Sequence, residues 1–440
     1  MDSMERLGKT IFYIIFAAIP AVLWYASSGF DATSFSSGYQ MVSIIAKMAA
    51  IVGICFFSGN LILSGRYKIV DRLFGGLDRV YLFHRRTGIT TFILLSTHVV
   101  LISARTLFES YDAFIAFVTN ITYLPINFGR FAYGGLFVII VITLWFGRKI
   151  KYERLKFIHS FMGVFLFFGG LHAFFIPSDI ATNLPLRWYV LGLASLGIIS
   201  WLVRTVFKRW LVRRHILDVI QVNPLPGIVT EVIMKPRNEK IRFLPGQFIF
   251  VRFRQKGFPY EDHPFSLTAS PEEGRLRISA KAIGDFTTKL KELKPGAEAH
   301  VQGPFGGFSF LRFKNKKQIW IAGGIGITPF ISMARYIRDN KDKVRDFNIT
   351  LFYSVKDEKE FVYKNELEEI SRKVPQLTFR PWNTKTQGYL TAEAVKKTLD
   401  LQNKDIFICG PQPMLHSLRT QFNNLGVVNS HIHFELFKLF

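Results

Sequence analysis

The sequence predicts a membrane all-α six-helix bundle, followed by an antiparallel β-barrel and an α/β domain. Within the 440 residues, the first half contains six apolar runs, each close to the ~20 residues needed to cross a bilayer. After residue 212, short runs of alternating apolar and polar residues end at turn residues, which is typical of a small barrel. From about residue 316, strands alternate with helical segments, which favours a parallel sheet.

The six expected spans lie at about residues 10–27, 40–64, 82–104, 131–147, 156–176 and 187–207. The connections between them are alternately rich and poor in lysine and arginine, and "GRKIKYERLK" is one of the basic ones. By the positive-inside rule, we expect a multi-pass protein of the plasma (cytoplasmic) membrane with both termini in the cytoplasm. Alternatively, the first run is a signal peptide, whose cleavage would leave five spans in the same orientation.

The composition excludes several classes of protein. The formal net charge of +24 is accounted for by the basic connections, so we expect no nucleic-acid partner. Cys55 and Cys409 are the only cysteines. This excludes a disulfide framework, a Cys-x-x-Cys zinc site and an iron–sulfur cluster held by four thiolates.

Four histidines stand in two of the apolar runs. His84 and His98 are fourteen residues apart. On an ideal helix, fourteen residues return to within about 40° of the starting direction and rise about 21 Å, so both side chains face one side. His159 and His172 are thirteen apart and miss alignment by about 140°, which an ideal helix does not explain. Because both runs cross the membrane in the same direction, His84 matches His159 in depth, and His98 matches His172. Two imidazoles at one depth suit the axial positions of a haem iron, so the pattern predicts two b-type haems.

Haem propionates require cations near the membrane faces. The expected partners are basic residues close to the ends of the spans: Arg66, Arg85 and Arg86 for the inner haem, and Lys47, Arg105, Arg130 and Arg187 for the outer one. Each of them could equally be a snorkelling or positive-inside residue.

The second half carries a series of short motifs. "LPGQFIFVRF", "EDHPFSLTASP" and "RISAKAIGDFTTKL" form a flavin signature when they occur together in this order. "AGGIGITPF" follows a strand and opens a helix, where glycines let dinucleotide phosphates approach the backbone. With "CGPQP", these motifs resemble a ferredoxin–NADP reductase module. Residues 40–440, histidine pairs included, resemble the NADPH oxidase / ferric reductase family. The expected domains are 1–212 in the membrane, 213–314 for FAD and 315–440 for NAD(P)H.

The resemblance implies a cytosolic FAD site on the barrel. Ser266 would bond the reactive central-ring nitrogen of the flavin, and Lys281 would meet the pyrophosphate with the backbone around Ala280. The full expected set is Pro245, Gly246, Gln247, His263, Pro264, Phe265, Ser266, Leu267, Ala280, Lys281, Gly284, Phe286 and Thr287. Its last three residues match the family's phosphate turn.

The α/β domain would bind the nicotinamide dinucleotide. The expected set is Gly323, Gly324, Gly326, Thr328, Pro329, Ser354, Lys356, Cys409, Gly410 and Pro411. Ser354 and Lys356 favour the 2′-phosphate of NADPH, while the neighbouring Asp357 keeps NADH possible. Cys409 would lie near the nicotinamide, and Phe440 would cover the flavin until the nicotinamide displaces it.

The implied activity is transmembrane electron transfer from NADPH through FAD and the two haems to an acceptor outside the cytoplasm. Bis-histidine ligation leaves no open iron position, so dioxygen would be reduced to superoxide at the haem edge. We expect no obligatory regulatory subunit. A ferric or other metal chelate, a quinone or a partner protein remain alternative acceptors. An alternative of another class is a haem-free transporter or membrane anchor that carries a flavin reductase.

Overall fold

A computed structural model describes residues 2–27, 37–147, 149–150, 152–212 and 214–435. The chain forms two compact units. The membrane unit consists of Glu5–Phe74 and Arg79–Val212. The second unit consists of Arg213–Phe440 with the short segments Met1–Met4 and Gly75–Asp78.

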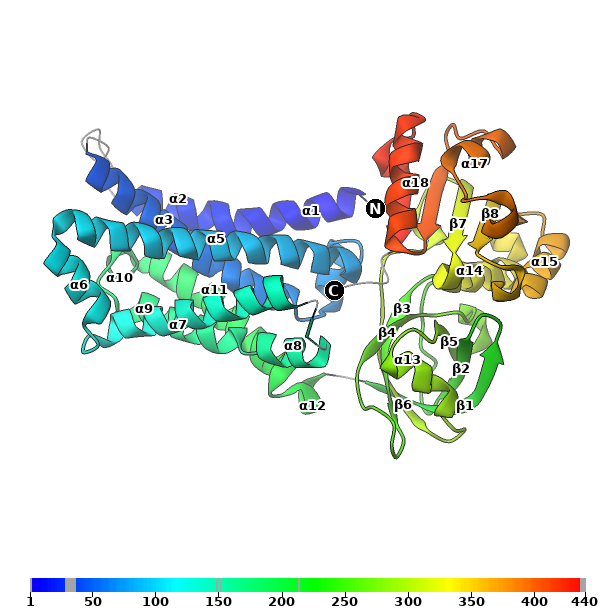
Figure 1. The fold of residues 1–440 in the computed structure, drawn as a ribbon, viewed down its shortest axis with the longest axis horizontal. Helices are drawn as coiled ribbons and strands as arrows, with labels where there is room; N and C mark the ends of the chain where they lie inside the picture. The colour runs from blue at the N-terminus through cyan, green and yellow to red at the C-terminus, as the bar shows by residue number, and fades with distance from the viewer. Residues whose placement is uncertain (1, 28–36, 148, 151, 213, 436–440) are drawn as a thin grey trace. The chain divides into compact units, whose positions relative to one another are not determined.

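The described part of the membrane unit contains six helices that are long and apolar enough to span a bilayer, and in Figure 1 they lie side by side. This confirms the six expected spans. The helices are α1 (Asp2–Tyr13) and α2 (Ile19–Ser27) joined by a π-helical turn, α3 (Gly38–Leu63), α4 (Lys68–Leu73), α5 (Leu77–Glu109), α6 (Tyr111–Thr119), α7 (Leu124–Val141), α8 (Tyr152–His159), α9 (Met162–Phe175), α10 (Asp179–Thr182), α11 (Leu184–Thr205) and α12 (Lys208–Leu211).

Local signals fix where several of these helices begin. The side chains of Ser37, Ser110 and Asn183 each accept a hydrogen bond from a backbone amide three residues on, at the starts of α3, α6 and α11. Helix α7 packs closely along α9, and α11 packs along both α3 and α9. Among the described residues, α5 makes no comparably close backbone contact along another helix. Side chains therefore have to span the space between α5 and its neighbours.

The barrel follows the membrane unit in the sequence. Its strands are β1 (His215–Leu225), β2 (Val229–Pro236), β3 (Phe248–Arg254), β4 (His263–Ser266), β5 (Leu276–Lys281) and β6 (Glu298–Phe305), with the short helix α13 (Asp285–Lys289). They pair antiparallel in the order β4-β3-β6-β1-β2-β5. A bridge between Leu267 and Ile278 joins the two edges, so the sheet closes into the expected barrel.

The α/β domain has the expected parallel sheet, and its five strands lie in the order β11-β10-β7-β8-β9. The strands are β7 (Lys317–Gly323), β8 (Asn348–Val355), β9 (Leu377–Asn383), β10 (Asp405–Cys409) and β11 (Ile432–Glu435). The helices are α14 (Thr328–Asp339), α15 (Lys364–Lys373), α16 (Thr384–Gln387), α17 (Ala392–Thr398) and α18 (Gln412–Asn424). One sheet face packs against α14 and α15, and the other against α17 and α18. Both faces are thus covered, as a parallel sheet requires.

Candidate functional site

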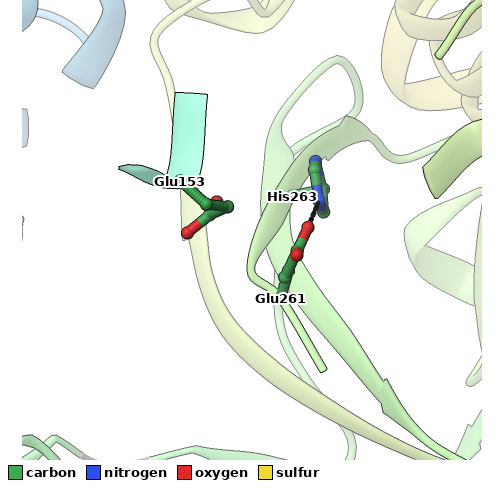
Figure 2. Close-up of side chains that lie close together, drawn as sticks. All are labelled: Glu153, Glu261 and His263. Carbon is green, nitrogen blue, oxygen red and sulfur yellow. Dashed lines mark hydrogen bonds and ion pairs between the residues drawn. The ribbon is translucent and has the colours of Figure 1, made fainter. Parts of the chain in front are cut away.

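The expected flavin segment forms strand β4. Ser266 is buried and lies opposite Phe248 on β3. The imidazole of His263 stacks on the ring of Phe286, with ring centroids 3.8 Å apart. Its Nε2 lies 3.2 Å from Oε2 of Glu261, the contact drawn in Figure 2. These side chains connect the "HPFS" and "GDFT" motifs directly.

The turn that is expected to bind phosphate is held by the hydroxyl of Thr287, one of its own residues. Oγ1 of Thr287 accepts hydrogen bonds from the backbone amides of Ile283 and Gly284, at 3.1 and 3.0 Å. A Cβ added at Gly284 would meet no atom within 4 Å, so this turn has space for a ligand. Nζ of Lys281 lies 2.9 Å from Oε2 of Glu360 in the α/β domain. Its expected contact with the FAD pyrophosphate therefore stays a prediction.

Other residues of the expected flavin set support the barrel. Gly246 has φ +93°, and an added Cβ would come within 2.1 Å of the Phe308 carbonyl oxygen. In the Gln247 side chain, Nε2 donates to the Gly306 carbonyl at 3.1 Å, and Oε1 accepts from the backbone amide of Leu244 at 2.8 Å. The remaining members lie in or beside strands: Pro245 before β3, Pro264 and Phe265 in β4, Leu267 in the barrel-closing bridge and Ala280 in β5. Sequence motifs alone do not separate such packing roles from ligand contacts.

The expected dinucleotide residues converge on the carboxyl edge of the parallel sheet. Register places Gly323 beside Ser354 and Ala322 beside Cys409. Ligands of open α/β sheets bind at this edge. The other expected residues here lie in the loops and helix starts that follow these strands: Thr328, Pro329, Gly410 and Pro411.

The three glycines of "GGIGITP" differ in what surrounds them. A Cβ at Gly323 would meet Sδ of Met414 at 2.5 Å, and one at Gly326 would meet the Cys409 carbonyl oxygen at 2.2 Å. Gly324 has φ +54°, and an added Cβ would find no atom within 4 Å. Thus Gly323 and Gly326 permit close packing of two loops. Gly324 faces open space, where a phosphate could approach.

Charged side chains follow β8, where the 2′-phosphate of NADPH is expected. Ser354 is buried at the end of the strand, and Lys356 is exposed just beyond it. Asp357 accepts a hydrogen bond from the Lys359 amide, and its carboxylate lies 3.5 Å from Nζ of Lys385. Both contacts lower the pKa of Asp357. Because this carboxylate is already paired, its repulsion of a 2′-phosphate is reduced.

Cys409 has an acidic neighbour that the sequence motifs do not indicate. It is buried, and parallel pairing places it beside Glu435 on β11. Burial raises the pKa of the Cys409 thiol well above its usual range, and the charge of Glu435 raises it further. The available signal is the acid that ends the strand "IHFE". Phe440, the expected flavin cover, lies outside the described residues.

The inner histidine pair comes together in the membrane unit. The rings of His84 and His159 have centroids 6.4 Å apart. Metal–nitrogen bonds are about 2 Å long, so two imidazoles on opposite sides of one metal place their centroids roughly 6 Å apart. Nδ1 of His84 donates to the Asn60 carbonyl at 3.1 Å, which leaves Nε2 unprotonated for a metal.

The outer histidines are oriented in the same way. Nδ1 of His98 donates to the Ala46 carbonyl at 3.0 Å, and Nδ1 of His172 donates to the Pro125 carbonyl at 2.7 Å. His159 differs, because its buried Nδ1 has no hydrogen-bond partner in the described part of the chain. Backbone carbonyls that hold Nδ1–H are usual for metal-ligating histidines. The donor set therefore fits axial ligation of haem iron.

A break in the fifth span explains the irregular spacing of its histidines. Helix α8 ends at His159 and α9 starts three residues later. The indole Nε1 of Trp201 donates to the Ser160 carbonyl, which takes that oxygen out of the helical ladder. A Cβ at Gly163 would come within 2.0 Å of the Trp201 ring, so glycine admits the indole. The 140° mismatch with His172 assumes one continuous ideal helix, so it does not apply across this break.

The basic residues at the two membrane faces are engaged to different degrees. Nζ of Lys47 is paired with Asp179 at 2.9 Å, and Arg105 is paired with an acid one helical turn on. Arg130 and Arg187 donate to backbone carbonyls and have no carboxylate partner in the described ranges. These two remain candidates for an anionic group near the outer pair. At the other face, Nε of Arg66 donates to the Tyr81 hydroxyl, and Arg85 and Arg86 are exposed.

Three family models match successive parts of the chain. Residues 49–170 match the ferric reductase like transmembrane component, residues 215–318 match an FAD-binding domain, and residues 320–420 match the oxidoreductase NAD-binding domain. The first matched segment contains His84, His98 and His159 and ends two residues before His172, and the other two fall on the barrel and the parallel sheet.

Known proteins are similar to part of the chain. The reductase component of glycine betaine monooxygenase from Pseudomonas aeruginosa is 26% identical over 52% of this chain and 66% of its own length. One superoxide-generating NADPH oxidase heavy chain of Dictyostelium discoideum is 29% identical over 52% of this chain and 47% of its own length. A second such heavy chain of the same organism is 27% identical over 47% of this chain and 32% of its own length. The chain thus spans between about a third and two thirds of these relatives. The domain matches and these similarities show a membrane oxidoreductase with a ferric-reductase-like transmembrane component, an FAD-binding domain and an NAD-binding domain, an arrangement similar to that of the NADPH oxidase and ferric reductase family.

Proposed function

We propose that the protein carries electrons across the cytoplasmic membrane, from cytosolic NADPH through FAD and two b-type haems to an acceptor on the opposite side. One observation carries this proposal: the rings of His84 and His159 stand 6.4 Å apart in the membrane unit. FAD is needed because it converts a two-electron hydride donor into single-electron steps.

Each part of the chain has a role in this proposal. Gly284 and Gly324 admit phosphates at two sites within one compact unit, and Ser266 orients the flavin. Lys356 favours NADPH over NADH at the sheet edge. In the membrane unit, the four histidines would hold the two haems through Nε2, and Nδ1 of three of them bonds a backbone carbonyl.

The favoured acceptor is dioxygen, which would be reduced to superoxide by one electron at the edge of the outer haem. Ligation by His98 and His172 would leave the iron no open position, so dioxygen would not bind the metal. The resemblance to superoxide-generating heavy chains supports this choice. No regulatory subunit is required in this proposal.

A ferric chelate is the second candidate acceptor. The membrane segment matches a ferric reductase like component. Arg130 and Arg187 carry positive charge near the outer pair with no carboxylate partner in the described chain, which would attract an anionic chelate.

The first test is a reduced-minus-oxidised spectrum of the purified protein in detergent. Two bis-histidine haems should give a low-spin b-type signal. A His98→Ala/His172→Ala variant should lose about half of it, and a His84→Ala/His159→Ala variant the other half. Full haem content in either double variant would disprove the ligand assignment, and no haem in the native protein would favour a flavin reductase on a membrane anchor.

The second test identifies the acceptor. NADPH oxidation would be followed with dioxygen, a ferric chelate or a quinone supplied separately, and superoxide dismutase would be included as a control. We expect dioxygen consumption with dismutase-sensitive dye reduction. Turnover only with the ferric chelate would replace superoxide formation by metal reduction.

A further inference from the structure

Helix α14 is hydrogen-bonded to the barrel through two buried polar side chains. Oγ of Ser332 donates to the Ala269 carbonyl at 2.6 Å, and Nη1 of Arg335 donates to the Thr268 carbonyl at 2.8 Å. Ser332 and Arg335 are 0% and 3% exposed. They stand three residues apart, on one face of the helix.

These bonds connect the two expected cofactor sites. Thr268 and Ala269 follow the flavin strand β4, two and three residues after Ser266. Helix α14 begins at Thr328, directly after the glycine loop that contains Gly324. A shift of α14 along the barrel would therefore move the dinucleotide loop relative to the flavin strand.

A second set of contacts holds Arg335 in place. Its guanidinium makes a bidentate pair with Glu366, at 2.8 and 2.7 Å, and lies 4.9 Å from the centroid of the Tyr363 ring. The Tyr363 hydroxyl bonds Oγ of Ser279 at 2.6 Å and Oε1 of Glu231 at 2.9 Å, both on the barrel. Tyr363 also has φ +62°, a conformation unusual for a tyrosine that the surrounding contacts must maintain.

Directional polar contacts fix position more tightly than apolar packing. A buried guanidinium with three matched acceptors tolerates little sliding, because displacement leaves a charge unpaired. Hydride transfer needs reacting atoms about 3–3.5 Å apart, and a 1 Å misplacement costs roughly a hundredfold. Two cofactor sites on different domains meet that limit only if the interface between the domains is fixed.

We propose that Ser332, Arg335 and Tyr363 are positioning residues that set the nicotinamide against the flavin for hydride transfer. The inference rests on the proposed function, in which two electrons and a proton pass together from the nicotinamide to the flavin. None of the three needs to touch either cofactor.

The test is anaerobic stopped-flow reduction of the flavin by NADPH in the full-length protein in detergent. The variants are Ser332→Ala, Tyr363→Phe and Arg335→Lys, which keeps the charge but loses the guanidinium geometry. The control is Arg338→Ala, because Arg338 also lies on α14 and reaches Glu366 at 3.4 Å, but it is only half-buried and pairs with its neighbour Asp339 rather than with the barrel. The measured quantities are the reduction rate at saturating NADPH, the nucleotide dissociation constant, the nicotinamide–flavin charge-transfer absorbance and the melting temperature.

We expect the three variants to reduce flavin roughly 10- to 100-fold more slowly, with weaker charge-transfer absorbance and a nearly unchanged dissociation constant. Arg338→Ala should behave as the native protein. Native reduction rates and charge-transfer absorbance in Ser332→Ala and Tyr363→Phe, with only a lower melting temperature, would overturn the inference. If Arg335→Lys fails to retain FAD, the two milder variants decide the question. A native protein whose flavin NADPH never reduces would instead overturn the proposed function.

Discussion

At the scale of single residues, the histidines differ in what holds their rings. The carbonyl that holds His84 belongs to Asn60, whose side chain also bonds α5. Oδ1 of Asn60 accepts from Thr87 at 2.8 Å, and its Nδ2 donates to Thr91 at 3.0 Å. Asn60, Thr87 and Thr91 are all buried. One residue therefore links α3 to α5 at the level of the inner pair, where the helices otherwise make little close contact.

We expect Asn60→Ala to loosen the inner haem specifically. Two buried side-chain hydrogen bonds to α5 are lost, each worth about 1 kcal/mol. The backbone carbonyl that accepts from His84 remains, but these two bonds no longer hold it against α5. A potentiometric titration should show a shifted reduction potential for the inner haem and an unchanged reduction potential for the outer haem. Ser58→Ala is the matched control, because its hydroxyl donates within α3 to the Ile54 carbonyl. Equal effects from both variants would argue against a specific role for Asn60.

The thiol of Cys409 should stay protonated at neutral and mildly alkaline pH. Its pKa is raised by burial and by Glu435, and the thiolate is the reactive form. In a Cys55→Ala background, the alkylation rate should still be rising at pH 9, beyond the usual thiol pKa of about 8.5. Glu435→Gln should move this profile to lower pH, since it removes a like charge. If the alkylation profile has the same pH dependence with and without Glu435→Gln, the placement of Glu435 beside Cys409 is wrong.

At the scale of elements, the interrupted fifth span is the feature on which the inner site depends. The break between α8 and α9 places His159 and His172 in two separate helices, so the two residues do not share one continuous helical phase. It exists because Trp201 on α11 bonds the Ser160 carbonyl and lies against Gly163. A contact with a neighbouring helix thus maintains the break beside His159, a proposed haem ligand.

Gly163→Ala should therefore disturb the inner site more than the outer one. The added Cβ would meet the Trp201 ring at 2.0 Å, and overpacking of this kind costs about 1–3 kcal/mol. Haem content and the low-spin spectrum should show partial loss at the inner site, with a lower melting temperature. Gly192→Ala on α11 is the control, because its Cβ would meet nothing within 4 Å. Native haem content in Gly163→Ala would mean that the break is not held by this contact.

At the scale of the whole molecule, the second unit contains complete cores of its own. One lies inside the barrel, and two cover the faces of the parallel sheet. Buried bonds from Ser332, Arg335 and Tyr363 join the barrel to the sheet domain. These features are what an independently folding fragment requires.

A fragment of about residues 213–440 should therefore fold alone, bind FAD and reduce artificial acceptors with NADPH. Its FAD content, circular dichroism and ferricyanide reduction would be compared with those of the full chain. A fragment that unfolds cooperatively yet never takes up FAD would contradict the flavin assignment of "HPFS" and "GDFT".

Local patterns in the sequence determined much of this protein. Long apolar runs predicted the six spans, and alternating apolar and polar residues predicted the barrel. Both patterns can be read locally because hydropathy and turn chemistry act over a few neighbouring residues. The same patterns placed the dinucleotide loop and Cys409 at strand ends, where parallel pairing brings them to one edge.

Only the tertiary structure decided which of these residues are engaged by distant partners. The break beside His159 depends on Trp201, 41 residues from the carbonyl it bonds, and Lys281 is paired with Glu360, 79 residues away. Glu435 meets Cys409 only because β11 pairs with β10. Such contacts are fixed by side-chain shape and charge across packed elements, and no local pattern in the chain encodes them.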